Sequence, residues 1–316
     1  MHIVYSDRYH VDIGAHVFHM GKYAKVRDGL VSRGLAGPAS MVEPSPAGWD
    51  DLALVHTAEY LEKTRSGGFR ASELALLELP WSPSVADGFR LMAGGTIAAA
   101  RLAVEAGARL ARDAGGGAGG SGGRLAAAAN LGGGFHHAFP SHGEGFCLYN
   151  DVAVAIRALQ RDGAIRRAAV VDADVHQGNG TAFIFDGDSS VFTFSIHQEH
   201  NYPHVKPRGS LDVGLPDGTD DRGYLHALER ALPAVIDSRP DLIVYVAGAD
   251  PYLEDQLGGL CLTYEGLRGR DFLVLSAARD AGSPAAIVFA GGYARRVEDT
   301  AAIHIATIEE AVRLGA

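Results

Sequence analysis

The sequence predicts a single α/β domain with a mostly parallel central sheet and helices on both of its faces. Short, continuous apolar runs alternate along the chain with longer segments that have the spacing of amphipathic helices, and this alternation is typical of parallel sheets covered on both faces. The length of 316 residues favours one large domain over two ordinary ones. No internal repeat is visible, which argues against a repeat architecture.

Six apolar runs are predicted as strands because each is short, continuous and bounded by polar or turn residues. In chain order they cover residues 2–6, 125–131, 168–174, 190–197, 242–250 and 285–293. Five segments have apolar residues at helical spacing and are predicted as helices at roughly 82–112, 149–162, 221–238, 263–281 and 297–313. Because strands and helices alternate, most neighbouring strands are expected to run parallel.

One low-complexity segment, GGGAGGSGG at residues 115–123, interrupts this pattern. Glycine- and serine-rich stretches form flexible connections, and this one is predicted to be a surface loop. A phosphate-binding loop would follow a strand and begin a helix, whereas this segment follows a helix and precedes a strand. The alternation of strands and helices continues across it, so residues 1–316 are predicted to form one domain.

The composition excludes several classes of protein. A formal net charge of −10 gives no broad attraction to nucleic acid or to anionic membranes. No stretch of about 18 uninterrupted apolar residues is present, so no membrane span is expected. Two cysteines, Cys147 and Cys261, are too few for a disulfide framework, and the N-terminus does not have the pattern of a signal peptide. These features predict a cytoplasmic protein.

Polar side chains follow four of the predicted strands. Residues 125–131 lead into GGGFHHAF, 168–171 into DADVHQGNG, 242–248 into ADPY and 285–289 into AGGY. In open parallel sheets, ligands bind beyond the carboxyl ends of the strands. We therefore expect the histidines, aspartates and tyrosine of these segments to meet in one crevice.

The segment after residue 171 predicts a metal site. Asp174 and His176 are two residues apart, so both side chains can face the same side of an extended or irregular loop. A catalytic ion needs a third protein ligand and an open coordination position, and Asp250 is the candidate for that ligand. Two carboxylates and one imidazole suit Zn²⁺, while the oxygen-rich character of the set leaves Fe²⁺, Co²⁺ and Mn²⁺ open.

Two histidines and a tyrosine supply groups for proton transfer and charge stabilisation. His136 and His137 follow three glycines, which permit close approach of the backbone to a ligand. A histidine near its reference pKa can accept a proton from water and then donate it to a leaving amine. Asp172 is placed to orient a neighbouring histidine or to help hold a second, structural cation. Tyr293 is placed to donate a hydrogen bond to an oxyanion on a carbonyl carbon.

Taken in order, the segments GGGFHHAF, GFCLYND, DADVHQGNG, SIHQ, GADPYLEDQLGGL and AGGY resemble the zinc-dependent histone deacetylases and their bacterial relatives. These proteins have the arginase/deacetylase α/β fold. The likeness extends from residue 16 to the end of the chain. Asn179, LGGL at 257–260 and GKYAKV at 21–26 resemble the class IV branch, in which hydrolysis of fatty-acyl-lysine is known.

The resemblance implies a role for each matching residue. Asp174, His176 and Asp250 would bind the catalytic Zn²⁺, with Fe²⁺ as the alternative in the cell. His137 would act as general base and then as general acid, and His136, paired with Asp172, would be an electrostatic helper. Asn179 would be a neutral partner for His137, and Tyr293 would polarise the acyl carbonyl. Asp172 and Ser195 would also help hold a structural K⁺ ion. The substrate tunnel would be formed by Phe146, Gly134 and Tyr202.

The predicted function is hydrolysis of an N-acyl amine, with acyl-lysine as the leading substrate. An acetylated polyamine or another small N-acyl metabolite stays open, because Glu199, Glu254 and Asp255 are available as rim carboxylates for a cationic chain. An arginase-like site with two Mn²⁺ ions would need further bridging ligands. A binding module without catalysis would be expected to have lost a metal ligand or Tyr293.

Overall fold

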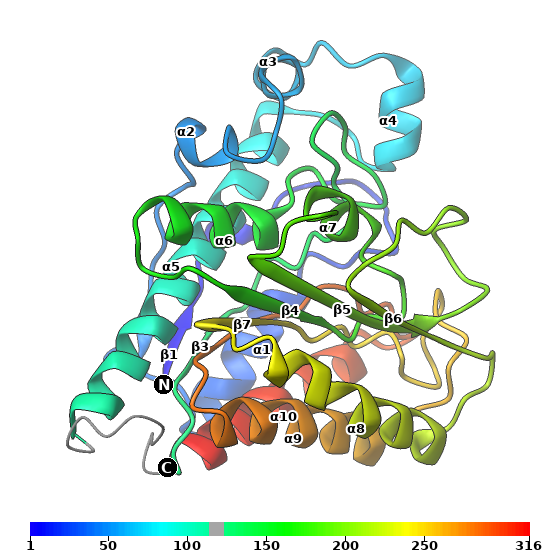
Figure 1. The fold of residues 1–316 in the computed structure, drawn as a ribbon. Helices are drawn as coiled ribbons and strands as arrows, with labels where there is room; N and C mark the ends of the chain where they lie inside the picture. The colour runs from blue at the N-terminus through cyan, green and yellow to red at the C-terminus, as the bar shows by residue number, and fades with distance from the viewer. Residues whose placement is uncertain (114–122) are drawn as a thin grey trace.

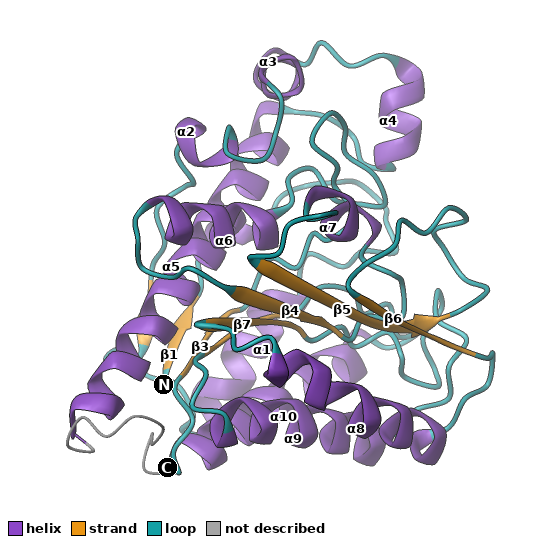
Figure 2. Ribbon diagram, viewed as in Figure 1, coloured by secondary structure: helices purple, strands orange, loops and turns teal. Residues whose placement is uncertain are grey.

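The computed structural model describes residues 1–113 and 123–316 and confirms the predicted α/β architecture (Figure 1 and Figure 2). The strands are β1 (His2–Val4), β2 (Met41–Val42), β3 (Ala127–Asn130), β4 (Ala168–Asp172), β5 (Val191–Gln198), β6 (Leu211–Leu215), β7 (Leu242–Val246) and β8 (Ala285–Val288). All of them belong to one parallel sheet with the order β2-β1-β3-β8-β7-β4-β5-β6. Residues 115–122 of the predicted glycine-rich loop lie outside the described residues.

Helices cover both faces of the sheet. In chain order they are the 3-10 helix η1 (Asp7–Tyr9) and the α-helices α1 (Lys22–Ser32), α2 (Trp49–Leu52), α3 (Ala58–Ser66), α4 (Ala71–Leu77), α5 (Pro83–Asp113), α6 (Asp151–Arg161), α7 (Asn179–Ile184), α8 (Asp221–Asp237), α9 (Tyr264–Asp280) and α10 (Val297–Gly315). In Figure 1, α8, α9 and α10 lie along one face and α5 and α6 along the other, and α1 packs on α10. Within the described ranges, no helix combines the length and the apolar character needed to cross a bilayer.

Side-chain caps determine where three of the predicted helices begin. The side chain of Asn150 accepts a hydrogen bond from the backbone N–H of Ala153 at the start of α6. Asp220 and Thr263 cap α8 and α9 in the same way. Each cap satisfies an N–H group that has no partner within the first turn of its helix.

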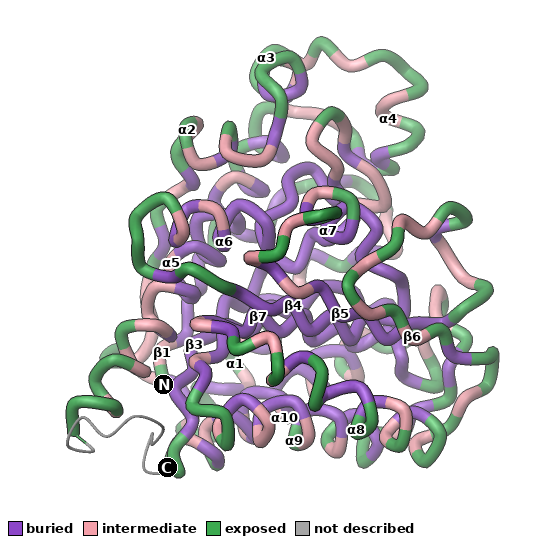
Figure 3. Tube along the Cα trace, in the orientation of Figure 1, coloured by how far each residue is buried: buried purple, intermediate pink, exposed green. Residues whose placement is uncertain are grey.

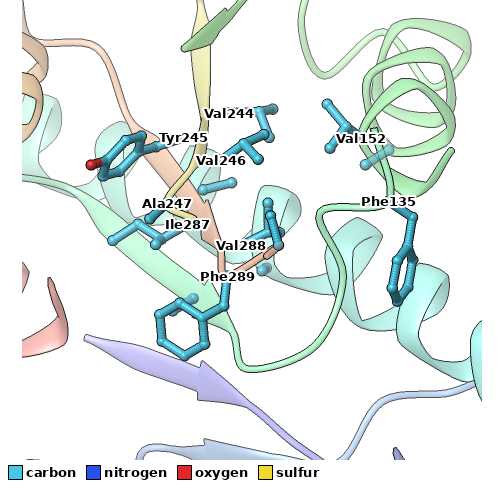
Figure 4. Packing of buried hydrophobic residues seen from close by; sticks show 14 of the residues in the cluster. Phe135, Val152, Val244, Tyr245, Val246, Ala247, Ile287, Val288 and Phe289 are labelled. Carbon is cyan, nitrogen blue, oxygen red and sulfur yellow. The ribbon is translucent and has the colours of Figure 1, made fainter. Parts of the chain in front are cut away.

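The central strands form the core of the molecule. Every residue of β4, β7 and β8 is buried, and Figure 3 shows the buried class running through the middle of the chain trace. Figure 4 shows Val244, Val246 and Val288 packed among other apolar side chains of this core. Since both faces of these strands are covered, their sequences are continuous apolar runs and not alternating ones.

The structure contains elements that the sequence patterns do not predict. β6 is an edge strand whose first four residues alternate between intermediate and exposed, so it lacks the continuous apolar run of the central strands. α1 buries Lys22, Tyr23, Val26 and Leu30 on one side. This stripe has helical spacing, but it begins with a lysine, which is rarely buried. The short helices α2, α3, α4 and α7 are also additions.

A buried ion pair connects α9 to two loops at the carboxyl edge of the sheet. Arg270 is fully buried, and its guanidinium donates hydrogen bonds to Asp271 at 2.9 and 3.0 Å. The same guanidinium donates to the backbone carbonyls of Ala173 and Gly248. Ala173 follows β4 and Gly248 follows β7, so one side chain ties together the loops that leave these neighbouring strands.

Substitution of Arg270 by methionine would leave the Asp271 carboxylate and two backbone carbonyls without this donor. Removing one partner of a buried ion pair costs about 3–5 kcal/mol, so we expect Arg270→Met to lower the free energy of unfolding by this amount in urea titrations. Arg268 on the same helix has a side chain that is 50% exposed, and Arg268→Met is the matched control, expected to change stability little. Equal losses in both variants would contradict the contribution assigned to the buried pair.

Candidate metal centre and active site

Four neighbouring strands bring the predicted site residues together. β3, β8, β7 and β4 are adjacent and parallel, so their carboxyl ends lie at one edge of the sheet. The strands end earlier than predicted because the last residues of each apolar run leave the sheet to form loops. These loops carry His136 and His137 after β3, Asp174 and His176 after β4, Asp250 after β7, and Tyr293 after β8.

Asp174, His176 and Asp250 form a compact group that could hold a metal ion. One ligand atom from each residue lies within 4.8 Å of the others, and all three residues are buried. Nδ1 of His176 is 3.1 Å from Oδ1 of Asp174 and 3.4 Å from Oδ2 of Asp250, so this nitrogen faces both carboxylates. Catalytic zinc sites commonly have three protein ligands and keep a further position open, and the group has this composition.

The electrostatics of this group favour a bound cation. Burial, followed by the repulsion of the nearby Asp174 carboxylate, raises the pKa of Asp250 to about 7. Oδ1 of Asp250 accepts a hydrogen bond from the N–H of Val175 at 2.9 Å, but its buried Oδ2 accepts none within the described part of the chain. A buried acceptor without a partner costs free energy. A divalent cation would supply the partner and neutralise both carboxylates, so the residues present fit such an ion.

The two adjacent histidines have partners of different charge. Nδ1 of His136 lies 2.7 Å from Oδ2 of Asp172, and Nδ1 of His137 lies 2.7 Å from Oδ1 of Asn179. Burial by itself lowers the pKa of His136, but the carboxylates of Asp172 and Asp174 together outweigh this effect and the pKa rises to about 9. Burial, followed by the neighbouring His136, lowers the pKa of His137 well below its usual value. At neutral pH, His136 is therefore cationic and His137 is neutral.

Asp172 and Ser195 lie side by side on neighbouring strands, since they are register partners in β4 and β5. Oδ1 of Asp172 accepts a hydrogen bond from the N–H of Asp174 at 3.2 Å. Oγ of Ser195 lies 2.9 Å from Nδ1 of His197. Both residues are buried, and their proximity is what a shared cation site would require.

A cavity of about 200 Å³ joins three of the predicted site residues, His137, His176 and Tyr293. Phe146 and Tyr202, which are predicted as tunnel residues, are also in its wall. The remaining lining residues are Glu78, Gly145, Asn201 and Leu257. One metal ligand, the candidate base His137, the candidate carbonyl donor Tyr293 and two aromatic side chains therefore face the same space.

Phe146 reaches the cavity from a tight turn. The N–H of Cys147 donates to the carbonyl of Glu144 at 2.9 Å, and the two residues between them, Gly145 and Phe146, have φ angles of 52° and 65°. A positive φ is uncommon for a bulky residue and costs about 1–3 kcal/mol. Such conformations occur at ligand sites, and here the turn presents the Phe146 ring to the cavity.

Gly134 lies where the loops after β3 and β8 meet. It is absent from the cavity lining and packs against Ala290, where a Cβ on residue 134 would come within 2.7 Å of the Ala290 Cα atom. With a φ of 84°, this glycine allows the loops after β3 and β8 to touch. Gly134 is therefore placed to set the spacing between the loops that carry His137 and Tyr293.

Two charged residues near the site are not predicted by the sequence patterns. Nζ of the buried Lys22 donates to the carbonyl of Ala290 at 2.6 Å, and burial lowers the pKa of this lysine to about 8. Oε1 of Glu144 accepts hydrogen bonds from Asn179 and Tyr202. The available signals are a lysine on the apolar stripe of a helix and a carboxylate beside the GFC segment.

Comparisons with known proteins identify the family. Residues 16–308 match the family model described as the histone deacetylase domain. An uncharacterized protein of Picosynechococcus is 41% identical over 285 residues, which cover 90% of this chain and 89% of the relative. Histone deacetylase 2 of Arabidopsis thaliana is 31% identical, with 99% of this chain and 79% of the relative covered. A solved structure of an HDAC homolog complexed with SAHA has a TM-score of 0.77 at 24% identity and covers 99% of this chain and 87% of its own, which shows a shared fold.

The family model and the relatives span most of the chain, in agreement with the resemblance of its motifs. The chain belongs to the histone deacetylase family.

Proposed function

We propose that this chain is a metal-dependent hydrolase of N-acyl amines and that acyl-lysine is its substrate. The observation that carries the proposal is that His137, His176 and Tyr293 share one cavity. A metal ligand, a neutral imidazole and a phenol in one space can activate water, stabilise charge on a carbonyl oxygen and protonate an amine. Membership of the histone deacetylase family supports the same class of reaction.

Asp174, His176 and Asp250 are proposed to hold the metal ion. An imidazole nitrogen and carboxylate oxygens suit Zn²⁺, and they also suit Fe²⁺, which is the alternative in the cell. When bound, the ion would supply Lewis acidity that polarises the carbonyl group and makes water more acidic. The protein keeps both carboxylates buried and close together, so that their charge is available to the ion.

His137 is proposed to be the general base and then the general acid. Its ring is neutral at pH 7 and bonds Asn179 through Nδ1, which leaves Nε2 to take a proton from water. The same nitrogen can then donate that proton to the leaving amine as the C–N bond breaks. The cationic His136, paired with Asp172, would help stabilise the negative charge that develops on the reacting carbonyl oxygen.

Tyr293 is proposed to donate its hydroxyl to the acyl carbonyl oxygen. Burial raises the pKa of Tyr293 well above its usual value, so the phenol keeps its proton and stays a donor. The backbone N–H of Tyr293 donates to Oδ2 of Asp255 at 2.6 Å, which holds the loop that carries the ring. A donor held in advance at this position stabilises the transition state by about 3–4 kcal/mol.

Phe146 and Tyr202 are proposed to be the walls of the substrate tunnel. Both side chains line the cavity that holds His137. The ring of Tyr202 packs against His137 in an edge arrangement, with 5.0 Å between the ring centroids. Aromatic walls would contact the alkyl stem of an acylated lysine and exclude bulk water from the reacting amide.

A structural K⁺ ion is proposed beside Asp172 and Ser195. The two residues are neighbours across β4 and β5, and both carry oxygen atoms, which hard cations prefer as ligands. The ion would offset part of the negative charge of Asp172 and hold the strand end that precedes Asp174 and His176. The loop with the metal ligands would thereby be stiffened.

A small N-acyl amine, such as an acetylated polyamine, is the second candidate substrate. Glu78 is exposed and lines the cavity, so its carboxylate is available to a cationic chain. Asp255, predicted as a rim carboxylate, instead accepts hydrogen bonds from the backbone N–H groups of Leu257, Gly258 and Tyr293. It is therefore engaged within the protein, and Glu78 takes its place as the candidate.

Replacement of Tyr293 by phenylalanine tests the proposed carbonyl donor. The ring stays and the hydroxyl is lost, so we expect Tyr293→Phe to lower kcat by about 10²–10³-fold, with the bound metal per chain unchanged. Tyr264 is partly exposed and away from the cavity lining, and Tyr264→Phe serves as the control. Full activity in Tyr293→Phe would remove the tyrosine from the mechanism.

The two candidate substrates can be separated by assays of the zinc-restored and the metal-depleted protein. We expect zinc-dependent hydrolysis of lysine peptides that carry acyl groups between acetyl and myristoyl, and lower kcat/KM for acetylated polyamines. If the polyamines are the better substrates, Glu78→Gln should reduce their kcat/KM by a factor on the order of ten, because a charge-assisted contact is lost. Absence of turnover with both classes would contradict the proposed function.

A further inference from the structure

Glu144 connects the partner of the candidate base to the wall of the tunnel. Its Oε1 atom accepts a hydrogen bond from Nδ2 of Asn179 at 2.7 Å and another from the hydroxyl of Tyr202 at 2.5 Å. Its Oε2 atom lies 3.5 Å from Nε2 of His142. The Glu144 side chain is only 13% exposed, and Asn179 is buried. A carboxylate thus ends a chain of contacts that begins at the ring of His137 and passes through Asn179.

The charge of Glu144 determines which group donates and which accepts in each hydrogen bond between His137, Asn179 and Glu144. Burial by itself raises the pKa of Glu144, but the hydrogen bonds from His142, Tyr202 and Asn179 outweigh it and hold the pKa below its usual value. Glu144 is therefore ionised at neutral pH, and an ionised carboxylate only accepts hydrogen bonds. Asn179 must turn its NH₂ group toward Glu144 and its carbonyl oxygen toward His137.

The orientation of Asn179 decides which nitrogen of His137 carries the proton. A carbonyl oxygen only accepts, so Nδ1 of His137, at 2.7 Å, must be the protonated nitrogen of the neutral ring. Nε2 then carries the lone pair. An amide has nearly the same shape after a half-turn, and without a second partner Asn179 could offer an N–H to Nδ1. The proton would then move to Nε2, the nitrogen that has to accept one.

We propose that Glu144 is a positioning residue that holds the Asn179 amide in one orientation and thereby sets the tautomer of His137. The proposal rests on the role of His137 as the base in the proposed function. Glu144 acts through Asn179, and its bond to Tyr202 couples the same carboxylate to the tunnel wall. The base is therefore prepared by a residue that does not itself line the cavity.

The same contact accounts for an amide, and not a carboxylate, at position 179. A carboxylate there would place a second negatively charged oxygen where the NH₂ group now lies, 2.7 Å from Oε1 of Glu144. Two carboxylates at that distance cannot both stay ionised. One of them would take up a proton, and the orientation of the partner of His137 would no longer be unique. Asn179 and Glu144 therefore form a matched donor and acceptor.

A matched pair can be reversed. In the double variant Asn179→Asp/Glu144→Gln, the amide at position 144 would donate to the carboxylate at position 179, which would still accept from Nδ1 of His137. We expect Asn179→Asp and Glu144→Ala to lower kcat by about 10–100-fold each. The carboxylate at position 179 also raises the pKa of His137, so the double variant should recover most of the loss seen in Asn179→Asp at the higher pH where this ring is neutral. A double variant that is no more active than Asn179→Asp would overturn the proposal.

The tautomer of His137 can be read without turnover, from ¹⁵N chemical shifts of the histidine rings in the zinc-loaded proteins. We expect protonated Nδ1 in the wild type and in the double variant, and Nε2-protonated or mixed tautomers in Glu144→Ala. An unchanged His137 signal in Glu144→Ala would contradict the proposal. Because this spectrum needs no substrate, a wild type without hydrolase activity would count against the proposed function alone.

His142→Asn is the comparison variant, because it removes a partner of the other Glu144 oxygen and leaves the Asn179 contact in place. We expect a smaller loss of kcat than in Glu144→Ala, because Asn179 and Tyr202 still donate to Glu144. An equal loss of kcat in His142→Asn and Glu144→Ala would assign the effect to the turn at 144–147, against the proposal. Melting temperature and bound zinc are measured in every variant, so that unfolding is not mistaken for loss of the base.

Discussion

Three buried carboxylates, those of Asp172, Asp174 and Asp250, lie at the carboxyl edge of the sheet, and the surrounding structure is arranged around their charge. Buried charges are costly unless each has a partner, which can be a cation, a hydrogen-bond donor or a metal ion. His136 is the partner of the Asp172 carboxylate, and His176 is the partner of the Asp174 carboxylate. Asp250 keeps one oxygen without a donor in the described residues, and a divalent ion is the partner that would complete the set.

The scaffold holds this charge by contacts that are remote in sequence. Parallel strands deliver the loops to one edge, and Arg270 ties the loop after β4 to the loop after β7. Lys22 binds the carbonyl of Ala290 in the loop that carries Tyr293. The two histidines differ in charge, and their partners differ too: His136 is paired with the carboxylate of Asp172, and His137 with the amide of Asn179. Because this edge of the sheet is buried and its loops are tied together, the cationic His136, the neutral His137 and the hydroxyl of Tyr293 can be held in place at neutral pH.

The sequence predicts the features that are local in the chain. Continuous apolar runs predict β4, β7 and β8, and the motifs that follow them predict the metal group, the family and the hydrolase class, all in agreement with the structure and the comparisons. The apolar pattern does not predict β6, because this edge strand is not apolar throughout. The sequence does not predict the roles of Lys22 and Glu144, because their partners lie 268 and 35 residues away and only folding brings them together.

The central claim is that Asp174, His176 and Asp250 hold one divalent ion. Its most direct test is calorimetric titration of the metal-free, folded protein with Zn²⁺, beside the variant Asp250→Asn. We expect one tightly bound ion per chain in the wild type. Asp250→Asn should lose that binding and stay folded, because the repulsion between the buried carboxylates is relieved. Two ions per chain, or no binding by the folded wild type, would contradict it.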